Sequence, residues 1–124
     1  MPMENVVISD SILGSIKKLI GPGVEHTFFD ADIITHINTA FFVLAQLGVG
    51  PSVPFTIQDD SETWSDFTSD EAKFRAVVDY VYLRVKQIFD PPTSSFVLSS
   101  MKEQQNELEW RLNVMAETPT WEEQ

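Results

Sequence analysis

The side chains of this sequence that could bind a metal or transfer a proton are two histidines and a run of carboxylates. His26 and His36 are the only histidines, and the 124-residue chain contains no cysteine. A zinc site needs more nitrogen or sulfur ligands at closer spacing, so the pair predicts no metal centre. Six of the 19 aspartates and glutamates lie close together in one segment, namely Asp59, Asp60, Glu62, Asp66, Asp70 and Glu71.

The acidic segment does not match a known catalytic or calcium-binding pattern. A calcium loop starting at Asp59 would need glycine at its sixth position and glutamate at its twelfth, where the chain has Trp64 and Asp70. Nucleophile elbows, phosphate loops and dinucleotide fingerprints are also missing. We therefore predict no catalytic, cofactor-binding or metal-binding residue and no enzyme. An enzyme subunit whose active site is shared between chains is the remaining enzymatic alternative.

The charge of the chain restricts its partners. The formal net charge is −11, whereas a protein that binds phosphates tightly needs a basic patch. Lysine and arginine are absent between Leu19 and Ala72. The resulting acidic surface either keeps the protein soluble, or it meets a basic partner or repels a nearby polyanion. No stretch approaches the roughly 20 apolar residues of a membrane helix, and residues 1–9 do not resemble a signal peptide, so a cytosolic protein without membrane contact is expected.

The spacing of apolar residues predicts an all-α fold, a single domain over residues 1–124 built as a small bundle of about four helices. The first helix begins after Ser9 or Asp10 and ends before Gly21, and the second runs from an Asp30 cap to about Leu47. The third starts at a Thr68 and Glu71 capping box. An extended arm is expected at residues 51–67, and a flexible polar tail at 117–124.

The third and fourth helices form a predicted αα-hairpin around Asp90, Pro91 and Pro92. The prolines end the third helix because they have no amide hydrogen and push Asp90 out of the helical region. Large aromatic residues beside an apolar stripe are usually packed, which favours a core position for Trp110. The predicted core of this hairpin comprises Val81, Val85, Ile88, Pro91, Pro92, Leu108, Trp110 and Leu112.

A connection as long as residues 51–67 is uncommon in a small helical domain unless it has a function. Trp121 lies in a segment too polar to form its own core, and it either anchors in a partner or is simply exposed. The candidates for contact with a partner are Phe55, Asp59, Asp60, Glu62, Trp64, Asp66 and Trp121.

The hairpin resembles the head–tail connector, or adaptor, proteins of tailed bacteriophages and prophages. The resemblance is carried by residues 80–86 (YVYLRVK), 89–98 (FDPPTSSFVL) and 107–113 (ELEWRLN), with a WSDF loop at 64–67. The order of the preceding helices is similar too, so the likeness covers most of residues 9–113.

This resemblance implies a structural virion protein, assembled in the host cytoplasm and located at the head–tail interface. Such a protein docks on the portal protein and forms a homo-oligomeric ring of about a dozen copies. The ring passes DNA without sequence-specific binding and receives a stopper or tail-completion protein. The arm at 51–67 and the tail at 117–124 then become candidate contacts with the portal or the channel. The alternative is a small acidic helical protein, of the DNA-mimic or inhibitor type, that acts as a monomer.

Overall fold

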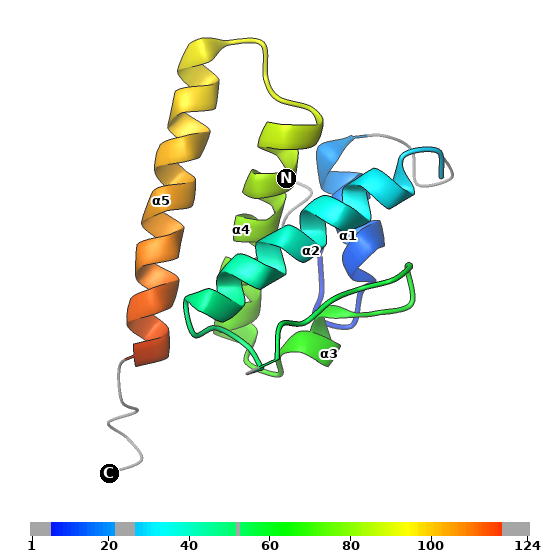
Figure 1. Ribbon diagram of the computed structural model, residues 1–124, viewed down its shortest axis with the longest axis vertical. Helices are drawn as coiled ribbons and strands as arrows, with labels where there is room; N and C mark the ends of the chain where they lie inside the picture. Colours follow the sequence, from blue (N-terminus) through cyan, green and yellow to red (C-terminus); the bar gives the residue numbers. More distant parts are fainter. Residues whose placement is uncertain (1–5, 22–26, 52, 118–124) are drawn as a thin grey trace.

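The computed structural model describes residues 6–21, 27–51 and 53–117 (Figure 1). Within these ranges the chain forms helices and no strand, and its one isolated β-bridge joins Ser11 and Thr63. The prediction of an all-α bundle with a helical hairpin is therefore confirmed. The helices are α1 (Ile12–Ile20), α2 (Asp30–Gln46), α3 (Trp64–Phe67), α4 (Glu71–Phe89) and α5 (Ser95–Glu117).

Helix α4 lies at the centre of the arrangement. Helix α2 crosses it, α1 packs against both α2 and α4, and α5 runs alongside α4 on the other side (Figure 1). This position explains why α4 buries seven side chains in nineteen residues, whereas the longer α5 buries only Leu112. Helix α5 is thus a helix packed on one side only.

Local signals set the helix starts, with two corrections. Ser11 caps α1, its hydroxyl accepting a hydrogen bond from the Gly14 amide. The predicted capping box at the start of α4 is wrong, because Asp70 is the cap. Its carboxylate accepts hydrogen bonds from the amides of Ala72 and Lys73. The Thr68 hydroxyl instead accepts a hydrogen bond from the Asp70 amide.

Asp30 was expected to cap α2, but it is the first residue of the helix and Phe29 holds the cap position without a side-chain hydrogen bond. The Asp30 carboxylate lies 2.8 Å from the Nζ atom of Lys17 in the last turn of α1. The Lys17 side chain is almost completely buried, so this is a largely desolvated pair. It joins the end of α1 to the start of α2.

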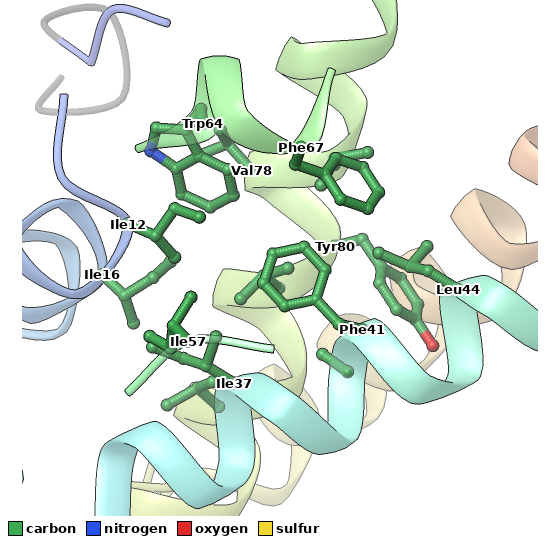
Figure 2. Packing of buried hydrophobic residues seen from close by; sticks show 14 of the residues in the cluster. Ile12, Ile16, Ile37, Phe41, Leu44, Ile57, Trp64, Phe67, Val78 and Tyr80 are labelled. Carbon is green, nitrogen blue, oxygen red and sulfur yellow. The ribbon is translucent and has the colours of Figure 1, made fainter. Parts of the chain in front are cut away.

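The core contains aromatic rings from three elements (Figure 2). The Phe41 ring of α2 lies 4.9 Å from that of Phe67 and 6.4 Å from that of Trp64, both in α3. On the other side of Trp64, the side chains of Ile12 and Ile16 reach in from α1. The short α3 therefore supplies two core residues to the space between α1, α2 and α4.

Some of the hairpin residues predicted to lie in the core are buried, and others are not. Val81, Val85 and Leu112 are completely buried, and Leu108 packs against the core while partly exposed. The prediction of Trp110 as a core residue is wrong, because 66% of its surface is exposed. Trp110 precedes Leu112 by two residues, or about 200° around the helix, so it points to solvent when Leu112 faces α4.

Three further predicted core positions lie at the turn of the hairpin. Ile88, in the last turn of α4, is 53% exposed. Pro91 is exposed and Pro92 half-buried. The prolines end α4 as predicted, but their rings border solvent because the loop they form joins the helices beyond the packed core (Figure 1).

Candidate functional site

The acidic segment, residues 51–67, follows α2 after a turn that requires glycine. Gly50 has a φ of 92°, and a Cβ atom placed on it would lie 2.5 Å from the Cε1 atom of Phe67. Only glycine combines this backbone conformation with so close an approach to an aromatic ring. The turn directs the following residues back across the core, with Val49 buried beneath it.

Asn38 of α2 holds the extended arm in place. Its Oδ1 atom accepts a hydrogen bond from the Ile57 amide at 2.8 Å, and its Nδ2 atom donates to the Ile57 carbonyl at 3.0 Å. The side chain thus satisfies both backbone groups of one residue, as a neighbouring strand would. The prediction of an extended arm at residues 51–67 is wrong for its last four residues, which form α3. The part before α3 forms no strand in the described residues, and it places Ile57 in the core while Val53 is exposed.

The carboxylates of the segment bond to their own backbone. Glu62 accepts hydrogen bonds from the amides of Gln58 at 2.9 Å and Asp59 at 3.3 Å. Asp59 accepts from the hydroxyl of Ser61 at 2.6 Å and from its amide at 2.8 Å. These bonds, the hydroxyl first, lower the pKa of Asp59. Both side chains therefore shape the turn as well as charge it.

The segment continues into α3 through a capping box between Thr63 and Asp66. The Asp66 carboxylate accepts from the Thr63 amide at 2.9 Å. Asp60, in contrast, is exposed and makes no hydrogen bond to the described part of the chain. Of the four predicted carboxylates, only Asp60 has no local structural role.

The aromatic candidates of the segment belong to the core. Trp64 is completely buried, so its prediction as a partner contact is wrong. Its Nε1 atom donates a hydrogen bond to the Ser15 hydroxyl at 3.1 Å. Phe55 is half-buried, with its ring 5.1 Å from that of Phe41 and 5.5 Å from that of Phe67. The acidic segment meets solvent with carboxylates and the core with its rings.

The structure describes only some of the remaining candidates. His36 lies on α2, whereas His26 and Trp121 lie outside the described residues. Glu117, expected in the tail, is the last residue of α5. In the ranges that the structure describes, histidines and carboxylates do not gather into a group able to hold a metal ion. No described helix is long and apolar enough to cross a membrane.

A polar network that sequence reasoning missed joins α4 to α5. The Tyr80 hydroxyl donates to the Glu109 carboxylate at 2.7 Å, which also accepts from Gln105 at 3.2 Å. Arg84 lies 3.5 Å from the same carboxylate. Burial, followed by the bond to Glu109, raises the pKa of Tyr80, so the phenol stays protonated at neutral pH and donates the hydrogen bond. Polar residues mixed into the apolar stripe of α5 were the available signal.

A groove of about 350 Å³ lies between α4 and α5. It was not anticipated, because its lining residues come from two helices whose spacing only the fold defines. Its walls combine apolar and charged side chains, namely Asp79, Tyr82, Leu83, Gln104, Glu107, Leu108 and Arg111. The arrangement suits binding to another protein, because it combines this groove, a helix packed on one side and a dense acidic segment.

Comparison with known protein families identifies the class. The family model described as phage connector protein matches residues 12–119. The chain therefore belongs to the phage connector protein family, which confirms the resemblance seen in the hairpin and supports a role as a phage head–tail connector. This membership implies a structural component of the virion. Neither the curated proteins nor the solved structures contain a match to this chain.

Proposed function

We propose that this protein is a head–tail connector that docks on the portal ring, assembles into a ring of about a dozen copies and forms part of the DNA channel. The observation that carries the proposal is the family match over residues 12–119. In this role it also receives a stopper or tail-completion protein on the far side of the ring. It acts without catalysis.

The one-sided packing of α5 supports ring assembly. A helix of 23 residues with a single fully buried side chain leaves most of its surface available to neighbours. Its exposed large apolar residues are Phe96, Val97, Trp110, Val114 and Met115. Apolar side chains gathered on one element are typical of a protein–protein contact.

The acidic segment supports a position beside the channel or a basic portal surface. Each contact between a fixed cation and a DNA phosphate adds affinity, which would slow the passage of the genome. Lysine and arginine are absent between Leu19 and Ala72, and the segment exposes Asp59, Asp60 and Asp66. We propose that these carboxylates, with Glu62, face the channel or the portal.

The proposal is tested by mixing the purified protein with the portal protein of the same phage. Electron micrographs are expected to show an extra ring under the portal, and light scattering a matching gain in mass. A protein that stays monomeric and leaves the portal unchanged would contradict the connector role. That outcome is the one expected for the acidic DNA-mimic alternative.

The acidic segment is tested with variants graded by structural role. Asp60→Asn removes charge alone, whereas neutralising Asp59, Glu62 and Asp66 also weakens hydrogen bonds that their carboxylates accept within the segment. Reduced portal binding or slower DNA ejection is expected for Asp60→Asn and more strongly for the fourfold variant. Asp32→Asn on α2 is the control for loss of an exposed negative charge. Normal binding and ejection by the fourfold variant would remove the segment from the proposal.

A further inference from the structure

The most exposed tryptophan of the described chain lies on the outer face of α5. Phe96, Glu103 and Trp110 follow one another at seven-residue intervals and Val114 follows after four, which places them on one side of the helix. Trp110 is 66% and Phe96 78% exposed. The indole N–H of Trp110 has no hydrogen-bond partner within the described residues. This side chain therefore offers a large apolar surface and an unused donor.

The groove between α4 and α5 offers the complementary features. Tyr82, Leu83 and Leu108 supply apolar surface, and the volume of about 350 Å³ is enough for an aromatic side chain. The Asp79 carboxylate lines the groove and accepts no hydrogen bond from the described residues. Its burial raises its pKa, an effect that Arg75 partly opposes. An N–H donor entering the groove would relieve that desolvation.

The charged side chains near the two surfaces are arranged differently. Glu103 and Glu117 lie on the outer side of α5. Arg111 borders the groove, paired with Glu107 at 2.7 Å. Lys86, one helical turn after Tyr82, is paired with Asp90 at 2.8 Å. The outer face is thus acidic, whereas each cation near the groove is already paired with a carboxylate of its own subunit. Apolar fit and the Asp79 carboxylate, not opposite net charge, are therefore what the groove offers to a second copy.

We propose that Trp110 of one copy inserts into the α4–α5 groove of the next copy, with its indole N–H directed to Asp79. The contact rests on the proposed ring assembly and names the surfaces that form it. Trp110 and the groove lie on different sides of α5. The side chain therefore does not fill the groove of its own subunit, and each molecule presents both surfaces. A contact between two different surfaces of identical copies propagates from copy to copy and closes into a ring when the rotation permits.

Two variants that leave opposite halves of the contact intact provide the test. Trp110→Ala removes the inserted side chain, and Gln104→Trp fills the groove from its exposed edge. Sedimentation velocity and light scattering, with and without portal protein, are expected to show at least a tenfold loss of self-association for each. Phe42→Ala, at an exposed position of α2, is the matched control and should assemble normally. Unchanged melting temperatures of the variants establish that they are folded.

Mixing the two variants gives the decisive result. Trp110→Ala keeps an open groove and Gln104→Trp keeps the Trp110 side chain, so the mixture is expected to form a one-to-one dimer that neither variant forms alone. If Trp110→Ala self-associates as well as wild-type protein does, this contact is overturned and the connector function still stands. Loss of portal binding with intact self-association would assign Trp110 to the portal instead and also overturn it. Wild-type protein that stays monomeric with portal would overturn the connector function itself.

Discussion

The indole of Trp64 and the hydroxyl of Ser15 form a buried hydrogen bond of 3.1 Å between α3 and α1. Ser15 also donates to the Ser11 carbonyl at 2.6 Å, so its hydroxyl both accepts and donates. A buried indole N–H needs such a partner, because its desolvation is otherwise uncompensated. The bond attaches the acidic segment to the first helix.

Replacing Ser15 with alanine is expected to destabilise the protein by about 1–3 kcal/mol, the cost of an unpaired buried donor. Urea unfolding measures this change. In a Trp64→Phe background the donor is absent, so the same Ser15→Ala substitution should cost less. Equal costs in the two backgrounds would show that the hydrogen bond contributes nothing.

Replacing Asn38 with alanine removes both bonds to the Ile57 backbone and leaves those groups partly buried. We expect a loss of about 2–3 kcal/mol, from two bonds of roughly 1 kcal/mol each plus the unpaired groups. Limited proteolysis should also cut residues 53–60 faster. Thr35→Ala, which removes an exposed hydroxyl bonded within α2, is the control, and similar behaviour of the two variants would contradict the proposed role of Asn38.

Removing the Tyr80 hydroxyl tests how α5 is held. Tyr80→Phe deletes the 2.7 Å bond to the Glu109 carboxylate and is expected to cost about 1.5–3 kcal/mol, as for hydrogen bonds to charged groups. Hydrogen exchange should show faster exchange of the α5 amides, since α5 packs chiefly on α4. Tyr82→Phe, one turn from Lys86 and without a hydrogen bond in the described structure, should leave both measurements unchanged.

Asp79 gives the monomer a specific pH dependence. Burial raises its pKa above the ordinary value of 3.8, so the folded state binds more protons than the unfolded state just above that value. Its contribution to stability is therefore present below pH 3.8 and lost as the pH rises through the raised pKa.

Asp79→Asn is accordingly expected to raise the melting temperature of the monomer at neutral pH, with the difference from wild type vanishing below pH 3.8. Thermal unfolding of dilute protein between pH 3 and 7 measures it. Asp60→Asn, in the exposed acidic segment, controls for the loss of one negative charge. A neutral-pH melting temperature of Asp79→Asn below that of wild type would contradict the burial argument.

The helical architecture could be predicted from local signals. Glycine after Ile20 and the prolines after Asp90 end helices wherever the rest of the chain lies, and α1 and α4 end where expected. The spacing of Val81, Val85 and Leu112 identified true core residues. The resemblance of the hairpin to phage connectors was likewise readable from the sequence, and the family match confirms it.

The exposure of the aromatic residues could not be predicted in this way. Trp64 and Trp110 both stand among polar and charged neighbours, yet the structure buries the first and exposes the second. Trp64 lies opposite α1, whose Ser15 matches its N–H, whereas the outer face of α5 has no helix opposite it within the described chain. The apolar stripe beside Trp110 favoured burial and the acidic residues around Trp64 favoured exposure, and the position of the neighbouring helix reversed both expectations.

The sequence by itself thus determined where α1 and α4 end, the acidic character of residues 58–71 and the family. These properties depend on backbone conformation and composition, which act over a few residues. The tertiary structure decided that Trp64 is core, and that Trp110 and the α4–α5 groove lie on different sides of one helix. Those facts depend on contacts between residues far apart in the chain, which no local pattern encodes.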